Sequence, residues 1–280
     1  MRAKKSLGQN FLVDGSTAAR IISAVAPAMD EAILEIGPGR GALTRLLLER
    51  AGLVLAVEID EELGEWLKTE LRSDRLMIIE ADILAVDLAS LLANVRAVHT
   101  QLQPRVRVVA NLPYYISTAV LTRLITARAL FKDFTLMLQR EVAERIISSP
   151  GSREYGVLSV MVQLYCQARR LFHVSPGAFR PIPKVDSTVL HLDVREVPIA
   201  PVADEALLTS VVQAAFSQRR KTIINSLKSA IASINPYLTP EQVAPILQAA
   251  AIEPIRRAET LSPLEYIHLS NAFLAAIQPH

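Results

Sequence analysis

The sequence lacks the residues that build disulfides and metal clusters. Cys166 is the single cysteine among 280 residues, so neither an internal disulfide nor a cysteine-based metal cluster can form. The five histidines show no paired spacing typical of metal ligands. No stretch approaches the roughly 18 consecutive apolar residues of a membrane span, and the basic start MRAKKSLGQNF has no apolar run typical of a signal peptide. These absences predict a soluble, cytoplasmic protein without a metal.

Acidic residues are missing from three long windows, residues 1–13, 155–185 and 206–240, although the net charge is only +2. Basic windows that converge in a fold would form a binding surface for a polyanion. Scattered solvated faces are the alternative, which charge alone slightly favours. The basic residues in these windows are Arg2, Lys4, Lys5, Arg169, Arg170, Arg180, Lys184, Arg219, Arg220, Lys221 and Lys228.

Short apolar, β-branched runs alternate with helix-like stretches through the first two thirds of the chain. This alternation predicts βαβ units in an α/β fold with a mostly parallel, seven-stranded sheet. The expected strands are residues 32–36, 53–59, 76–81, 105–110, 134–139, 168–174 and 187–194. The expected helices between and beside them are residues 14–27, 41–51, 61–71 and 140–147.

Composition changes at the proline-rich segment VREVPIAPVADEA, which predicts a linker. Beyond it the pattern is helical. We expect an α/β domain over residues 1–197 and a small all-helical domain over 203–280. The expected helices of the second domain are residues 204–216, 221–231, 239–250 and 262–277.

The segment ILEIGPGRGALT, residues 33–44, has the pattern of a strand, a glycine-rich turn and a helix start. Gly37 and Gly39 would let the backbone approach a ligand at the carboxyl edge of the sheet. The glycine spacing differs from the dinucleotide pattern G-x-G-x-x-G, and Pro38 removes a backbone N–H that a pyrophosphate would use. A nicotinamide dehydrogenase is therefore disfavoured. Taken alone, the turn could equally be purely structural.

Acidic residues end the next two predicted strands. Glu58 follows Gly37 by 21 positions, close to the spacing of about 20 at which an acid binds ribose hydroxyls. Asp82 ends the third strand, where it could accept a hydrogen bond from an adenine amino group. Each acid alone is better explained as an exposed strand end or a helix cap. Together with Gly37 and Gly39 they predict an adenosine-containing ligand without a pyrophosphate, which fits S-adenosylmethionine and its product S-adenosylhomocysteine.

The fourth strand ends in NLPYY, a motif whose polar groups could bind the exocyclic amine of an adenine. The lone pair of N6 is delocalised into the ring, and acceptors for both N6 hydrogens would turn it toward a methyl donor. The Asn111 side-chain oxygen and the Leu112 carbonyl, which Pro113 restricts, can supply these acceptors. Tyr114 offers a flat face for an extruded base. A rigid proline turn with packed tyrosines is the alternative.

Further residues could contribute to the same site. Phe179 could stack on the other face of the base, or it could pack under the proline-rich loop AFRPIPKVDS. Arg180 and Lys184 would then lie near phosphates. Tyr115 has no assigned chemistry and is expected in the core. Ser117 is expected to cap the next helix.

Seven segments in order resemble the ribosomal RNA adenine dimethyltransferases of the KsgA type: SLGQNFLVD, EIGPGRGALT, VEID, ADIL, NLPYYIST, FRPIPKVDS and FSQRRKT. The resemblance runs from Lys4 to about Thr222. It implies a Rossmann-like class I methyltransferase fold that uses S-adenosylmethionine and no metal. It also implies N6,N6-dimethylation of two adjacent adenosines in the 3′-terminal hairpin loop of 16S rRNA, with a role in small-subunit biogenesis. The implied partner is the small ribosomal subunit, and the protein would be a monomer without a membrane association.

The resemblance also implies site residues. The cofactor contacts would be Asn10, Leu12, Gly37, Glu58, Asp82 and Asn111. The target-base contacts would be Asn111, Leu112, Tyr114 and Phe179. The segment GQNFL could close over the cofactor.

The basic triplet in FSQRRKT is expected to bind RNA. Arg219, Arg220 and Lys221 would reach rRNA phosphates while Phe216 packs inward. An ordinary basic helix face is the alternative. For the whole chain, two competing functions are a resistance methyltransferase acting on large-subunit rRNA and a non-catalytic assembly factor.

Overall fold

The structure is a computed structural model that describes residues 3–4 and 7–277. Arg2 and Lys5, two of the basic residues singled out above, lie outside the described residues. Contacts divide the chain into two compact units. Unit 1 comprises residues 1–143 and 168–194, and unit 2 comprises residues 144–167 and 195–280.

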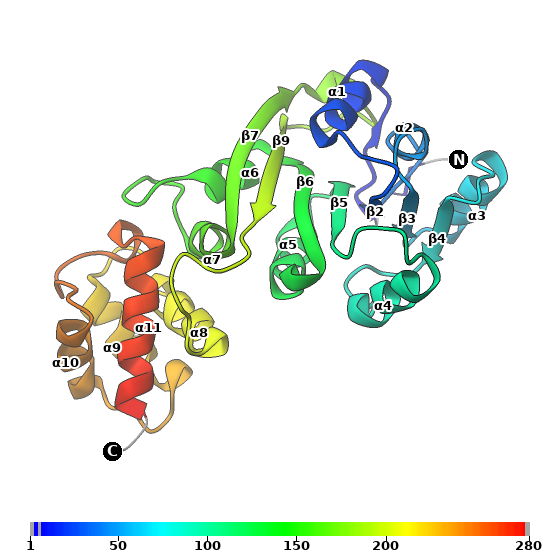
Figure 1. The fold of residues 1–280 in the computed structure, drawn as a ribbon. Coiled ribbons are helices and arrows are strands. Elements are labelled where there is room, and N and C mark those ends of the chain that lie inside the picture. Colours follow the sequence, from blue (N-terminus) through cyan, green and yellow to red (C-terminus); the bar gives the residue numbers. More distant parts are fainter. Residues whose placement is uncertain (1–2, 5–6, 278–280) are drawn as a thin grey trace. The chain divides into compact units, whose positions relative to one another are not determined.

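A mixed seven-stranded sheet forms the centre of unit 1, and its strands run in the order β4-β3-β2-β5-β6-β9-β7 (Figure 1). The pairs β4-β3, β3-β2, β2-β5 and β5-β6 are parallel, whereas β6 and β9 are antiparallel. The prediction of a mostly parallel α/β sheet is confirmed. The strands are β2 (Ala32–Ile36), β3 (Leu53–Glu58), β4 (Leu76–Glu80), β5 (Val106–Asn111), β6 (Phe131–Gln139), β7 (Cys166–Val174) and β9 (Ser187–Val194).

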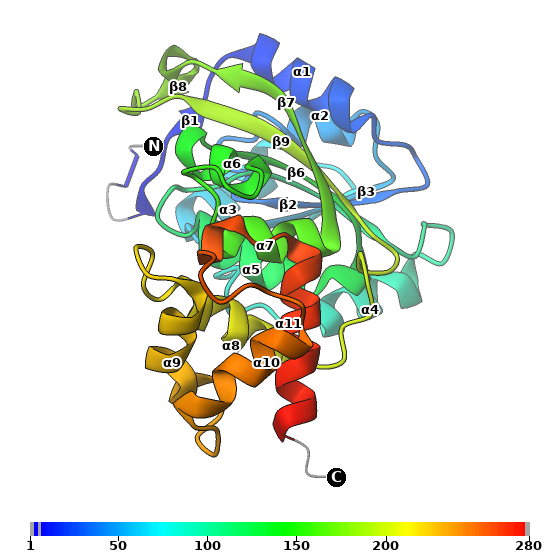
Figure 2. The same ribbon diagram turned by 90° about the vertical axis from the view of Figure 1, so that its left-hand side faces the viewer.

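Helices cover both faces of this sheet. Every residue of β2 and β3 is buried, as expected for parallel strands covered on both sides. Figure 2 shows α1 and α2 over one face and α4 and α5 over the other. The helices are α1 (Gly15–Val25), α2 (Thr44–Leu48), α3 (Glu61–Glu70), α4 (Leu88–Val98), α5 (Ser117–Thr126) and α6 (Arg140–Ile147).

The predicted helix over residues 14–27 is confirmed by α1, which has identifiable ends. The Asp14 carboxylate accepts a hydrogen bond from the Thr17 N–H at 3.0 Å and caps the first turn. Ala26 adopts a left-handed conformation and ends the helix. The buried face of α1, which includes Ile21 and Ile22, packs in an apolar cluster with residues of β2, β3 and β5.

The strand order changes direction at β2. β2 pairs with β3 on one side and with β5 on the other, while the chain visits β3 and β4 before it returns to β5. Ligands of open α/β sheets bind at such a switch point, outside the carboxyl ends of the strands. The ends of β2, β3, β4 and β5 therefore mark the expected site.

A second, two-stranded sheet pairs distant parts of the chain. β1 (Phe11–Leu12) is antiparallel to β8 (Phe179–Arg180), with Phe11 opposite Arg180 and Leu12 opposite Phe179. This pairing fixes the segment before α1 against the proline-rich loop. The sequence pattern did not predict either of these short strands.

Unit 2 is helical, and the four predicted C-terminal helical segments are confirmed. The Phe216 ring stacks on the Tyr266 ring with centroids 5.9 Å apart, so Phe216 packs inward as expected. The α-helices are α7 (Val157–Tyr165), α8 (Glu205–Phe216), α9 (Ile223–Ile234), α10 (Val243–Ala249) and α11 (Pro263–Ile277). Within the described part of the chain, no helix has the length and apolar character needed to cross a membrane.

Two helices were not predicted, α4 and α7. α7 has an apolar sequence, VLSVMVQLY, without the polar face that marks a surface helix, and it contacts α8 and α11. These contacts group residues 144–167 with the C-terminal helices, although they lie inside the predicted domain of residues 1–197. The division into functional domains over 1–197 and 203–280 stays a prediction.

Candidate active site

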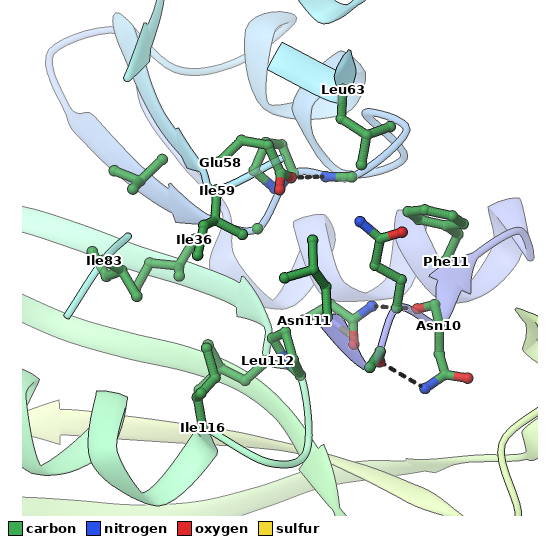
Figure 3. A pocket seen from close by; sticks show the side chains of 18 of the residues that line it. Asn10, Phe11, Ile36, Glu58, Ile59, Leu63, Ile83, Asn111, Leu112 and Ile116 are labelled. Atoms are coloured by element: carbon green, nitrogen blue, oxygen red, sulfur yellow. Dashed lines mark hydrogen bonds between the residues drawn. The ribbon is translucent and has the colours of Figure 1, made fainter. Parts of the chain in front are cut away.

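A cavity of about 160 Å³ lies at the carboxyl ends of β2, β3 and β5 (Figure 3). Residues from five segments line it: 7–12, 35–43, 57–63, 81–83 and 111–116. The structure therefore brings together all the predicted cofactor-binding residues: Asn10, Leu12, Gly37, Gly39, Glu58, Asp82 and Asn111.

The glycine-rich turn has a backbone conformation that requires glycine. Gly37 and Gly39 have φ angles of +67° and +56°, a region that side chains with a Cβ rarely adopt. A Cβ at Gly39 would lie 3.0 Å from the Phe11 ring. Because these two glycines have no side chain, a ligand in the cavity and the Phe11 ring can both come close to the backbone of the turn.

Glu58 ends β3 with its carboxylate held by backbone N–H groups. Gly39 N–H donates to Oε2 at 3.1 Å, and Asp60 N–H donates to Oε1 at 3.0 Å. The residue is only 5% exposed, and burial raises the pKa of its carboxyl group. A carboxylate can accept about four hydrogen bonds, so Glu58 retains capacity for ligand hydroxyls.

Asp82 lies two residues beyond β4, in the turn after the strand and not at its last residue, which is Glu80. Its Oδ1 accepts a hydrogen bond from the Leu84 N–H at 2.9 Å, and the side chain is half-buried at the cavity. Glu58 thus ends β3, Asp82 follows the end of the neighbouring β4, and both acids line the cavity as the sequence pattern predicted.

Glu35 is a cavity residue that the sequence reasoning missed. It is the fourth of the five residues of the buried strand β2 and is 1% exposed, and burial raises its pKa to about 8. Among the described residues, no hydrogen-bond partner reaches Oε2 of this carboxyl group. The signal in the sequence was a single acid inside the apolar run AILEI. The oxygen is itself buried, so Glu35 is a group of the protein interior beside the cavity and offers no contact to a ligand through Oε2.

Asn111 has a fixed side-chain orientation at the end of β5. Its Nδ2 donates to the Asn10 carbonyl oxygen at 3.2 Å, which leaves Oδ1 as an acceptor (Figure 3). Leu112 N–H donates to the Met137 carbonyl at 3.2 Å. Among the described residues, no backbone N–H donates to the Leu112 carbonyl. Two acceptors therefore stand next to each other at the cavity.

Tyr114 also lines the cavity and is half-buried. Its hydroxyl group hydrogen-bonds with the Ser187 hydroxyl at 3.0 Å, and burial raises the pKa of the phenol. The hydrogen bond attaches the ring to the start of β9. The predicted residues Asn111, Leu112 and Tyr114 are thus together at one cavity.

The described residues before α1, residues 3–4 and 7–14, form an arm that side-chain contacts hold beside the cavity. Lys4 Nζ lies 2.7 Å from Asp60 Oδ1, and Gln9 Nε2 donates to Asp60 Oδ2 at 2.9 Å. The Arg40 guanidinium lies 4.7 Å from the centroid of the Phe11 ring. Lys4, which charge alone suggested for a polyanion surface, is therefore engaged with an acid beside the cavity.

Phe179 is not brought to the cavity. Its side chain is 1% exposed and packs in the apolar cluster that also contains Leu12 and Ile21. Arg180 and Lys184 are exposed, and Arg180 Nη1 donates to the Phe179 carbonyl at 2.7 Å. Phe179 pairs with Leu12 of the arm in the two-stranded sheet. Its role in stacking on the target base stays a prediction.

Two expectations for residues next to NLPY were wrong. Tyr115 is 59% exposed and lines the cavity instead of packing in the core. Ser117 is the first residue of α5, where Ile116 holds the cap position without a side-chain hydrogen bond. The Ser117 hydroxyl donates instead to the Tyr114 carbonyl at 3.1 Å and so stabilises the turn.

The basic triplet of the second unit lies in a turn, not on a helix. Arg219, Arg220 and Lys221 are all exposed between the end of α8 at Phe216 and the start of α9 at Ile223. A turn presents three consecutive side chains to solvent more freely than one helix face does. The triplet is therefore accessible to a large ligand.

Comparison with known proteins decides the family. A family model described as ribosomal RNA adenine dimethylase matches residues 1–269. The chain belongs to this family. A ribosomal RNA small subunit methyltransferase A from Geobacter metallireducens is 45% identical over 276 residues, which cover 98% of this chain and 97% of the relative.

Two solved structures resemble this ribosomal RNA adenine dimethylase chain over nearly its full length. The crystal structure of a dimethyladenosine transferase from Plasmodium falciparum has a TM-score of 0.77 at 24% identity, and covers 95% of this chain and 98% of its own. The crystal structure of the 23S rRNA methyltransferase ErmE has a TM-score of 0.66 at 26% identity, and covers 94% and 99%. The first likeness establishes the shared fold, which is that of a class I methyltransferase.

Proposed function

We propose that this chain transfers methyl groups to the N6 amines of two adjacent adenosines in the 3′-terminal hairpin loop of 16S rRNA, as part of small-subunit biogenesis. The observation that carries the proposal is the Asn111 amide, whose nitrogen is held by the Asn10 carbonyl. Family membership and the names of the relatives support the substrate class. The protein would act in the cytoplasm as a monomer, with the small ribosomal subunit as its partner.

The cavity residues fit S-adenosylmethionine. Gly37 and Gly39 let the backbone approach the ligand, Glu58 would accept the ribose hydroxyls, and Asp82 would accept the adenine amino group. Asn10 and Leu12 would cover the ligand from the arm. When bound, S-adenosylmethionine supplies an electrophilic methyl group on a sulfonium.

The target adenine would be positioned by acceptors. Asn111 Oδ1 and the Leu112 carbonyl would each accept one N6 hydrogen, which favours a pyramidal nitrogen with its lone pair aimed at the methyl group. Tyr114, attached to Ser187, would stack on the extruded base. In each transfer the methyl carbon would bond to N6 as its bond to sulfur breaks, and the surplus N6 proton would leave to water. Asn111 and Leu112 hold the nitrogen and need not act as bases.

An alternative is methylation of large-subunit rRNA, because the chain also resembles ErmE at 26% identity. The 45% identity with a small-subunit methyltransferase and the basic triplet Arg219–Lys221 favour the small subunit. Dimethyladenosine would be mapped after incubation of the protein and labelled cofactor with unmethylated 30S particles or with naked 23S rRNA. Transfer to 23S rRNA alone would refute the proposal.

A second test concerns Asn111. We predict that Asn111→Ala lowers kcat by about 10²–10³-fold, the usual cost of removing one polar group that orients a reacting atom. Binding to the small subunit should be retained, since it depends on other surfaces. Single-turnover methyl transfer and subunit co-sedimentation would measure the two effects.

The matched control for this test is Asn225→Ala, an exposed asparagine of α9. It should behave as the unchanged protein in both assays. Full turnover by Asn111→Ala would show that Asn111 does not orient the N6 amine. A parallel loss of subunit binding would point to a folding defect of the variant. A non-catalytic assembly factor would show subunit binding without methyl transfer by the unchanged protein.

A further inference from the structure

Tyr115 is an exposed aromatic side chain at the cavity. It is 59% exposed, whereas its neighbours Leu112 and Ser117 are each 1% exposed. The residue lines the same cavity as Asn111 and Tyr114. An aromatic ring left in water at the edge of a functional cavity has apolar surface available for a ligand.

The local backbone holds Tyr115 in place. Ile116 N–H donates to the Pro113 carbonyl at 3.2 Å and closes a turn with the two tyrosines at its centre. On the arm side, Gly8 has a φ angle of +56°, and a Cβ there would lie 3.0 Å from Tyr115 Cδ1 and 3.3 Å from Cε1. The absence of a side chain at Gly8 therefore makes room for the Tyr115 ring.

The two consecutive tyrosines are held in different ways. Tyr114 is attached through its hydroxyl group to Ser187 and is half-buried. Tyr115 lies against the arm at Gly8 and remains exposed. One turn thus presents two aromatic rings at one cavity, and only the inner ring has a role in the proposed function.

We propose that Tyr115 stacks on the purine base next to the adenosine in the site, so that two consecutive adenosines are preferred over an adenosine beside a pyrimidine. The proposal rests on the proposed function. Stacking of a base on an exposed aromatic side chain corresponds to about 5- to 150-fold in affinity per base. Stacking strength, and not hydrogen-bond readout, gives such contacts their modest base preference.

The experiment compares Tyr115→Phe, Tyr115→Leu and Tyr115→Ala with the unchanged protein. Two substrates are used: unmethylated small subunits, and small subunits in which uridine replaces one of the two adjacent adenosines. Methyl transfer to the remaining adenosine gives kcat/KM, and calorimetry gives the affinity for S-adenosylhomocysteine. Tyr115→Leu is the matched control, because it retains an apolar side chain against Gly8 and removes the aromatic face.

The expected pattern is specific to stacking. Tyr115→Phe retains kcat/KM, while Tyr115→Leu and Tyr115→Ala lose about tenfold, within the range for one stacked base. Uridine beside the target lowers kcat/KM of the unchanged protein but causes no further loss in the Leu and Ala variants. The affinity for S-adenosylhomocysteine stays the same in all four proteins.

Three other results would overturn the inference. They are full activity of Tyr115→Leu, an equal loss on both substrates, and a parallel loss of S-adenosylhomocysteine affinity, which would mean that Tyr115 only holds the arm. Failure of the proposed function looks different, since the unchanged protein would then transfer no methyl group to either adenosine.

Discussion

Glu35 is a carboxyl group that the fold buries inside β2, next to the glycine-rich turn. Its pKa is raised from 4.5 to about 8, mainly by burial, and the nearby Glu58 carboxylate raises it further. At neutral pH the ligand-free protein therefore retains a proton on Glu35 that the unfolded chain has lost.

This burial predicts a pH dependence of stability. Between pH 4.5 and about 8 the unfolded chain binds fewer protons than the folded protein, so the free energy of unfolding falls as the pH rises through this window. In Glu35→Gln, which cannot ionise, the fall should be smaller. Urea unfolding of the ligand-free proteins at several pH values between 5 and 8 would measure it.

The control for this comparison is Glu70→Gln, which makes the same change at an exposed position at the end of α3. Its stability should follow that of the unchanged protein across the window. If Glu35→Gln also did so, Glu35 would be ionised in the folded state and the burial argument would be wrong.

The glycine-rich turn between β2 and α2 lines the cavity and also contacts the arm at Phe11. Gly39 combines a positive φ angle, contact with the Phe11 ring, and an N–H that donates to Glu58. No other residue type satisfies the first two requirements without strain. The conformation of this short element therefore determines the position of the Glu58 carboxylate as well.

We predict that Gly39→Ala destabilises the protein by about 1–3 kcal/mol, because alanine must adopt a left-handed conformation and meets the Phe11 ring at 3.0 Å. Affinity for S-adenosylhomocysteine should also fall. Thermal unfolding and calorimetry would measure both effects. The matched control is Gly15→Ala, because Gly15 is the first residue of α1 and has open space around its Cβ position. Equal stability of the two variants would exclude a special role for the turn.

The elements of the sheet could be predicted from the sequence because their signals are local. Buried runs such as those of β2 and β3 are apolar throughout, and Glu58 and Asp82 follow directly from the strand ends. The side-chain positions of Tyr115 and Phe179 could not be predicted, since they depend on distant partners. Gly8 of the arm contacts the Tyr115 ring, and Leu12 pairs with Phe179.

Binding of the whole molecule to RNA would depend on exposed basic residues outside the cavity. Arg219, Arg220 and Lys221 lie in an exposed turn of unit 2. We predict that their triple replacement by alanine weakens binding to the small subunit and flattens its salt dependence, by roughly 0.7–0.9 in the log–log slope for each lost phosphate contact. Binding measured over a series of salt concentrations would give both quantities.

A charge-matched variant separates specific contacts from net charge. Replacement of Arg50, Arg72 and Arg153 by alanine removes the same charge at exposed positions elsewhere. Its salt slope should stay close to that of the unchanged protein. An equal change in both triple variants would mean that net charge alone governs binding, and the turn would then be an ordinary basic surface.

The pairing of β1 with β8 has a consequence for synthesis of the chain on the ribosome. Phe11 and Leu12 are made early, but their partners Arg180 and Phe179 emerge only after the strands β2 to β7. Domains fold in the order in which their residues become available. The arm therefore has no partner strand while the central sheet assembles. Arm residues 7–12, which line one side of the cavity, gain the support of β8 only after this long interval.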